Sequence, residues 1–125
     1  MLRTCLLAAV AAVCVSGCVT ANPEAIGPYP TNWEQALRET IRKTFFDPYS
    51  IRDARATSPQ QGHLYFQQGW VVCFEANAKN RMGGYTGLKR TAYLLNNGQV
   101  VNAMTDAPMC NGPGLSYQPF AMPAS

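Results

Sequence analysis

The apolar and polar positions first separate a leader from the rest of the chain. A short apolar run extends from Leu6 to Val15 and follows Arg3. It is shorter than the roughly 20 residues of a membrane-spanning helix. A basic residue, a short apolar run and small residues after it are typical of a secretory leader. Residues 19–30 are rich in proline, which favours extended backbone and predicts a tether.

An amphipathic helix is predicted directly after the tether. Apolar residues recur at helical spacing and form one face: Trp33, Ala36, Leu37, Ile41, Thr44 and Phe45. Thr31 and Glu34 have the spacing of a capping box, and Asp47-Pro48 should end the helix near Phe46. We expect this face to pack on the core rather than on a membrane, because it includes Ala and Thr and lacks a dense basic flank.

The remaining pattern indicates strands. Residues 51–57 have the charges of an edge strand, and residues 69–76 form the clearest strand. In the latter, one face should meet the helix: Trp70, Val72, Phe74 and Ala76. Residues 58–62 read as a loop, while His63 to Gln67 either extend the next strand or belong to the connection.

A hairpin is predicted near the end of the domain. Strands over 85–95 and 99–104 flank Asn97-Gly98, which suits a type I′ turn. From about residue 105 the chain reads as an irregular tail. We therefore expect an α+β fold, with one N-terminal amphipathic helix packed on a three- to four-stranded antiparallel meander.

The end of the leader resembles a bacterial lipobox, Val15-Ser16-Gly17-Cys18. The resemblance implies diacylglycerol on the Cys18 sulfur, cleavage before Cys18, and acylation of the new amine, for example by palmitate. Val19 follows, rather than Asp, and by the enterobacterial sorting rule this favours the periplasm-facing side of the outer membrane. We expect a signal peptide over 1–17, a lipidated tether over 18–30 and one domain over 31–125. The alternative is an uncut N-terminal anchor helix.

The resemblance to a lipobox assigns a role to three of the five cysteines. Cys5 and Cys14 lie in the leader and Cys18 is the lipidation site, so Cys73 and Cys110 remain. A compartment outside the cytoplasm permits a disulfide between them. The alternative is two free thiols, with Cys73 packed as a small apolar residue.

Composition and charge exclude several classes of function. The 125 residues suffice for one domain, and the net charge of +3, about +2 without the leader, is too small to indicate nucleic-acid binding. His63 is the only histidine, no Gly-x-Ser-x-Gly elbow occurs, and metal ligands are scarce. Glu75 with Asp53 or Asp106 is a weak carboxylate pair, and Glu75 is expected to face solvent. We predict no cofactor, no metal and no catalytic residue.

The stretch from Asn77 to Arg90 is the candidate binding site. It combines amides, cations and glycines, but it has neither the P-loop nor the dinucleotide-binding spacing. Glycines let a backbone approach a ligand closely, and cations recognise anionic groups. The candidate contacts are Asn77, Lys79, Asn80, Arg81, Gly83, Gly84 and Tyr85. The alternative is a glycine-rich connection between strands, with its cations on a solvated face.

Three segments together carry a family resemblance: Tyr49 to Ala54, Gly69 to Cys73, and Asn77-Ala78-Lys79-Asn80 with Gly83-Gly84-Tyr85-Thr86-Gly87. Over roughly residues 31–104 the chain resembles a family of small, uncharacterised proteobacterial lipoproteins. The resemblance implies a secreted lipoprotein and assigns no catalytic residue.

These observations favour a non-enzymatic, lipid-anchored envelope protein that binds another envelope component, a protein or cell-wall glycan, through residues 77–90. One alternative is an inhibitor or immunity-type lipoprotein acting on a cell-wall hydrolase. Another is an envelope hydrolase that uses His63 or Glu75.

Overall fold

The computed structural model describes residues 26–122. The leader, the lipobox with Cys18 and most of the predicted tether lie outside the described residues. The elements follow in the order α2 (Trp33–Thr44), η1 (Pro48–Ser50), β1 (Arg52–Ala56), β2 (Gln60–Leu64), β3 (Gln67–Lys79), β4 (Tyr85–Asn96), β5 (Gln99–Thr105), η2 (Pro108–Asn111) and β6 (Gln118–Pro119), where η1 and η2 are short 3₁₀ helices. No helix in this part of the chain is long and apolar enough to span a bilayer.

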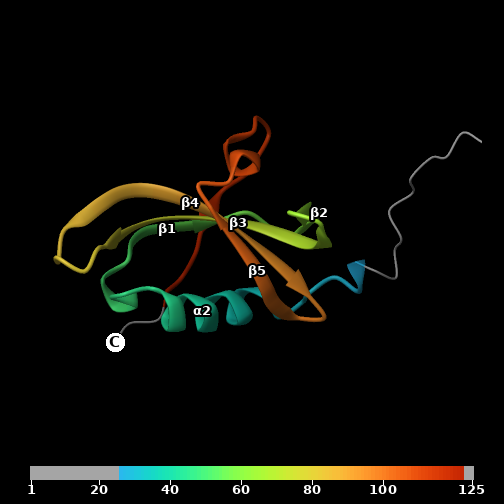
Figure 1. The fold of residues 1–125 in the computed structure, drawn as a ribbon, viewed down its shortest axis with the longest axis horizontal. Coiled ribbons are helices and arrows are strands. Elements are labelled where there is room, and N and C mark those ends of the chain that lie inside the picture. Colours follow the sequence, from blue (N-terminus) through green and yellow to red (C-terminus); the bar gives the residue numbers. More distant parts are fainter. Residues whose placement is uncertain (1–25, 123–125) are drawn as a thin grey trace, which may run out of the picture.

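The strands form one antiparallel sheet in the order β5-β4-β3-β1-β6. β1 pairs with the C-terminal half of β3, and β2 pairs with its N-terminal half, so both lie along the same edge of β3. β3 and β4 are the longest strands, and their ladder runs from the Trp70–Leu95 pair to the Lys79–Tyr85 pair. In Figure 1 their hairpin extends beyond the body of the domain.

The predicted three- to four-stranded meander is wrong. The described chain is 45% strand and 21% helical, with six strands and one short α-helix. The additional strands are β2 and β6. Neither shows the alternation of apolar and polar residues that reveals a half-buried strand, since β2 is Gln-Gln-Gly-His-Leu and β6 has only two residues.

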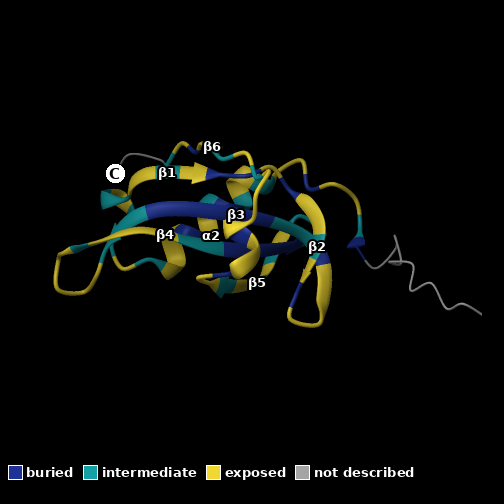
Figure 2. Cartoon of the chain, turned by 90° about the horizontal axis from the view of Figure 1, so that it is seen from above, coloured by how far each residue is buried: buried dark blue, intermediate teal, exposed yellow. Residues whose placement is uncertain are grey.

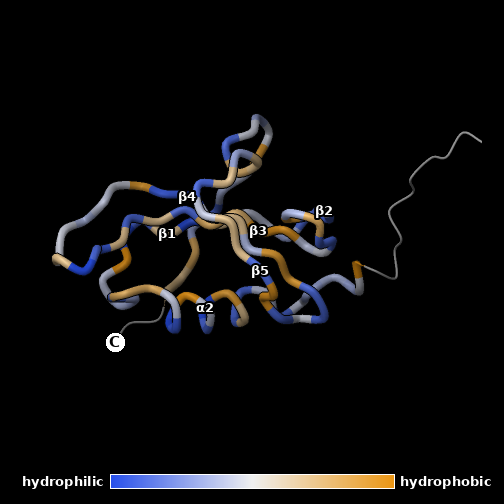
Figure 3. Tube along the Cα trace, in the orientation of Figure 1, coloured by the Kyte–Doolittle hydropathy of each residue, from blue (hydrophilic) through white to orange (hydrophobic). Residues whose placement is uncertain are grey.

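α2 covers one face of the sheet. Leu37 and Ile41 are fully buried against the predicted inward side of β3, where Val72 and Phe74 are also buried. Figure 3 shows hydrophobic segments gathered where the helix and sheet face each other. Apolar residues at a spacing of three to four bring α2 to this face.

The N-terminus of α2 differs from the predicted capping box. Asn32 is the N-cap residue and makes no side-chain cap hydrogen bond. Its Nδ2 atom instead donates to the Gly98 carbonyl, 3.2 Å away. Asn97 and Gly98 have φ angles of 51° and 75°, which confirms the predicted turn with positive φ at both central positions. The helix start is thus attached to the β4–β5 turn.

The C-terminal segment covers the opposite face of the sheet. Figure 1 shows it above the sheet, with α2 below. Ala107 and Cys110 are buried there against Cys73, Ala92 and Leu94, which form part of a second apolar cluster. The expected irregular tail is therefore a packed layer, and the chain then returns through β6 so that Phe120 enters the first cluster.

The end of the predicted tether lies against the domain. Ile26 is 3% exposed, and the Gly27 carbonyl accepts a hydrogen bond from Trp70 Nε1 at 3.2 Å. The Tyr29 and Trp70 rings meet edge to face, with centroids 5.1 Å apart. The chain therefore joins the sheet at the N-terminal end of β3.

Candidate binding site

The loop between β3 and β4 is organised by one asparagine. The Asn80 N–H donates to the Gly84 carbonyl, and the Asn80 carbonyl accepts from the Gly83 N–H. Its Oδ1 atom also accepts from the N–H groups of Met82 and Gly84, at 3.0 and 3.1 Å. Gly83 has a φ of +81°, a conformation that favours glycine. The turn is thus held by its own hydrogen bonds.

The Asn77 side chain also accepts a hydrogen bond from the hairpin backbone, nearer the body of the domain. Its Oδ1 atom accepts from the Gly87 N–H at 3.0 Å, beside a register shift between Asn77 and Lys79. Both candidate asparagines therefore use their side-chain oxygens within the hairpin. The structure explains them as elements that fix its shape.

Tyr85 connects the hairpin to the body of the domain. Its hydroxyl donates to the Ser50 carbonyl at 2.9 Å. The Arg52 guanidinium lies 4.1 Å from the centroid of the Tyr85 ring, and Lys79 Nζ lies 5.4 Å from it. Tyr85 is half-buried and points back toward η1, so it braces the hairpin.

Other side chains at the end of the hairpin face solvent. Arg81, Gly83 and Gly84 are exposed, Met82 is 93% exposed, and Leu88 is 59% exposed. Figure 2 shows the connecting loop and most of the adjoining part of β4 as exposed and the end of β3 as intermediate, in contrast with the buried centre of β3. Met82 and Leu88 are not among the predicted contacts, because an isolated apolar residue in a polar stretch carries no signal for binding.

A groove of about 420 Å³ lies beside the hairpin, on the face of the sheet that α2 covers. α2 ends at Thr44, whereas β3 and β4 continue, so part of this face remains open. The groove is lined by Thr40, Thr44, Phe45, Phe46, Phe74, Ala76, Ala78, Lys79, Thr86, Lys89, Thr91, Tyr93, Ala103 and Thr105. Its size falls within the range of about 300–1,000 Å³ for ligand pockets.

The lining of the groove has a distinct chemistry. Phe46 is 62% exposed at its edge, and Ala76 and Phe74 are buried in its wall. Lys79 and Lys89 are its only charged residues, and both come from the predicted binding stretch. The groove therefore combines an apolar surface with positive charge.

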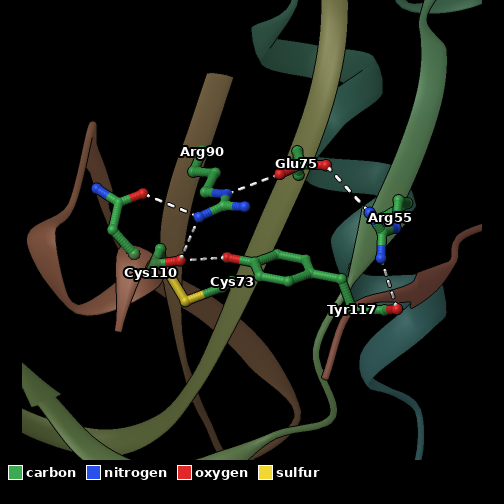
Figure 4. Close-up of polar contacts among 7 residues, drawn as sticks. Arg55, Cys73, Glu75, Arg90, Cys110 and Tyr117 are labelled. Carbon is green, nitrogen blue, oxygen red and sulfur yellow. Dashed lines mark hydrogen bonds and ion pairs between the residues drawn. A yellow bond between two sulfur atoms is a disulfide. The ribbon is translucent and has the colours of Figure 1, made fainter. Parts of the chain in front are cut away.

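Glu75 occupies a different environment, on the opposite face of the sheet (Figure 4). The expectation that it faces solvent is wrong, because it is 4% exposed. Oε2 accepts from Arg90 Nε at 2.7 Å, and Oε1 lies 3.7 Å from Arg55 Nη1. Tyr117 donates its hydroxyl to the Cys110 carbonyl at 2.7 Å and lies below Arg90. Together these contacts attach the C-terminal layer to the sheet.

The contacts and burial of this cluster change the pKa values of two of its side chains. The hydrogen bond to Glu75 raises the pKa of Arg90. Burial raises the pKa of Tyr117 above its usual value of 10.0. Glu75 has two cations as neighbours, with Oε2 facing Arg90 and Oε1 facing Arg55. These contacts favour a structural role for this carboxylate.

The predicted disulfide between Cys73 and Cys110 is present and joins β3 to η2. His63 is exposed in β2 and lies away from the hairpin, beside Gln61 and Met109. Within residues 26–122, no group of three or more His, Cys, Asp or Glu side chains is arranged to hold a metal ion.

Comparison of the chain with family models, curated proteins and solved structures finds no significant match. The lipoprotein resemblance and the family resemblance therefore stay predictions.

Proposed function

We propose that the protein is a non-enzymatic, lipid-anchored envelope protein, on the periplasm-facing side of the outer membrane, that binds another envelope protein. The supporting observation is the groove beside the β3–β4 hairpin, because four of its lining residues belong to the stretch predicted to bind: Ala78, Lys79, Thr86 and Lys89. Binding sites are concave and mainly apolar, with a few polar groups that fix orientation.

The chemistry of the groove favours a protein segment over a glycan. A neutral sugar chain would leave the positive charge of Lys79 and Lys89 without a partner. An apolar side chain of a partner would bury against Phe46 and Ala78. Lys79 and Lys89, with no acidic residue in the lining, favour a carboxylate next to that side chain. The proposed ligand is an acidic protein segment with apolar anchor residues.

The fixed shape of the hairpin supports the same function. Asn77, Asn80 and Tyr85 hold it through hydrogen bonds to backbone atoms. A surface that is already ordered loses less conformational entropy on binding than a flexible loop. The hairpin can therefore present Arg81 and Met82 beside the groove at little cost.

Site-specific photocrosslinking in cells tests this proposal. A photoreactive amino acid is placed at Phe46, at Met82 or, as a control on the opposite face, at exposed Ser116. We expect positions 46 and 82 to give one shared protein adduct that position 116 does not give. The double substitution K79E/K89E should abolish the adduct, because it reverses the charge of the groove.

The outcomes separate the parts of the proposal. Adducts with bulk lipid alone, or an adduct that K79E/K89E leaves unchanged, would contradict the binding function. Inhibition of a panel of lysozymes by the purified protein would favour the hydrolase-inhibitor alternative instead. The C18S substitution should abolish incorporation of labelled palmitate if Cys18 carries the lipid.

A further inference from the structure

A second hairpin, between β2 and β3, carries exposed aromatic residues at its tip. Leu64 and Gln67 form the last pair, which leaves Tyr65 and Phe66 as the two turn residues. Phe66 is fully exposed and Tyr65 is 58% exposed. Tyr65 also has a φ of 54°, in the region that turns usually fill with Gly, Asn or Asp. The fold thus presents two aromatic side chains to the solvent in a turn that would favour small polar residues.

The chain around this tip is uncharged. Residues 56–74 contain no Lys, Arg, Asp or Glu, and the polar side chains on the two strands are mainly glutamines. Charged groups oppose entry into a bilayer, whereas Tyr and Trp are favoured at the membrane interface and Phe on the apolar face of peripheral segments. The β3–β4 hairpin contrasts with this one, since it carries Lys79, Arg81 and Lys89.

The tip lies at the end of the domain where the N-terminal segment joins it. The Gly27 carbonyl and Tyr29 contact Trp70, which is four residues from Phe66. Figure 1 shows the start of the described chain and β2 at the same end of the molecule. Ile26 is eight positions after Cys18, and this length of chain spans at most about 28 Å when extended. A lipid on Cys18 would therefore keep the tip close to the bilayer.

We propose that Tyr65 and Phe66 insert into the interface of the bilayer to which Cys18 is anchored. This inference rests on the lipid anchor of the proposed function. The two hairpin ends lie at opposite ends of β3, whose 13 residues span about 40 Å at roughly 3.3 Å each. With the Tyr65-Phe66 tip in the membrane, the groove and the basic hairpin point away from it, toward the periplasm.

Fluorescent labelling of the lipidated full-length protein tests the inference. F66C, and M82C as the matched control at the other hairpin, each receive an environment-sensitive dye; both replaced side chains are exposed, so folding should be unchanged. Cys73 and Cys110 are bridged. In the lipidated protein the leader with Cys5 and Cys14 is removed and the Cys18 sulfur carries the lipid, which leaves the new thiol for labelling. The proteins are reconstituted into phosphatidylethanolamine–phosphatidylglycerol vesicles. We expect the emission at 66 to shift to the blue and to be quenched by brominated lipid chains, with no change at 82.

Other results would overturn the inference in distinguishable ways. If the label at 66 stays in water while the protein floats with the vesicles, the tip does not insert and the anchor still stands. A blue shift without quenching by brominated lipids indicates a second copy of the chain, and insertion of both labels indicates no fixed orientation. A protein that does not float with the vesicles contradicts the anchor itself and, with it, the proposed insertion.

Discussion

Arg90 Nε donates a hydrogen bond to Glu75 Oε2 across 2.7 Å, between neighbouring positions on β4 and β3. Glu75 is buried, whereas the Arg90 side chain remains 36% exposed. Arg90 also donates to the Cys110 carbonyl and to Asn111 Oδ1. The pair therefore joins the sheet to the C-terminal layer. Removal of Arg90 would leave a buried negative charge, whereas neutralisation of Glu75 would not.

We expect R90A to destabilise the fold more than E75Q. R90A leaves a buried carboxylate with Arg55 as its remaining cation, at 3.7 Å. Because Arg90 is partly exposed and Arg55 remains, we expect a loss of about 2 kcal/mol, less than for a fully buried pair. E75Q removes the buried charge itself, so we expect a loss of about 1 kcal/mol. Urea unfolding at neutral pH measures the free energy of unfolding of both variants. R42A, at an exposed position, is the control for the loss of an arginine. Equal losses for R90A and R42A would show that the pair contributes nothing.

The disulfide should provide a second connection to the same layer. Cys73 and Cys110 enclose a sequence separation of 37 residues. The loop-entropy model gives about 3–4 kcal/mol for such a loop. We expect the double variant C73A/C110A to lose about this much free energy of unfolding, measured by guanidinium titration. Reduction of the wild-type protein should give a similar loss, and an unchanged midpoint in both cases would contradict the prediction.

Asn80 should determine the shape of the β3–β4 turn. N80A removes the acceptor for the N–H groups of Met82 and Gly84, at a cost of about 1–2 kcal/mol if each net hydrogen bond contributes about 0.5–1 kcal/mol. The two amides should exchange their hydrogens faster, and the crosslink from position 82 should weaken. N80D keeps the acceptor and serves as the control. Unchanged exchange in N80A would show that the turn holds without this side chain.

Local sequence patterns predicted the helix, the central strands and the Asn97-Gly98 turn. Each of these has a short-range signal: a period of three to four residues, a β-branched and aromatic run, or a residue pair that adopts positive φ. The disulfide could be predicted because the two cysteines remained once the others were assigned. β6 and the packed C-terminal layer depend on contacts with distant residues, such as Phe120 with Phe74, and no local pattern reveals them.

The sequence pattern points to residues 77–90 as a binding stretch, which stays a prediction, but the groove beside it has no signal in the sequence. Its Phe46 comes from the segment that follows α2 and its Ala103 from β5, so it exists only when these elements meet. The asparagines were selected because amides recognise ligands, yet their oxygens serve the hairpin backbone. Glu75 alternates with the inward side of β3 and is buried only by the C-terminal layer, whose packing has no local signal.

Gly69 should tolerate no side chain. A Cβ atom there would lie 2.6 Å from the Leu95 carbonyl oxygen and 3.0 Å from a Leu94 methyl group. Because the first contact is with backbone, we expect G69A to lose about 1–3 kcal/mol, as overpacked cores do. Gly84 is the matched control, since its nearest neighbour would be 3.8 Å from the added Cβ. Thermal unfolding compares the two, and equal midpoints would contradict the expected clash.

Tyr93 should make the stability depend on pH in the alkaline range. Burial raises its pKa from 10.0 to about 12. Below pH 10 both the folded and unfolded states keep the phenol proton, so the contribution of Tyr93 to stability is complete. As the pH rises from 10 toward 12, the unfolded state loses the proton while the folded state retains it, and the stability decreases by at most about 1.4 kcal/mol per pH unit.

Y93F removes this ionisation and keeps the ring. Between pH 10 and 11 we expect the free energy of unfolding of the wild type to fall by about 1 kcal/mol more than that of Y93F, because of the single additional proton released on unfolding. Urea titrations at pH 8, 10 and 11 measure the difference, and ionisations common to both proteins cancel. Parallel curves would show that the Tyr93 hydroxyl has the same affinity for its proton in both states, which would contradict the prediction.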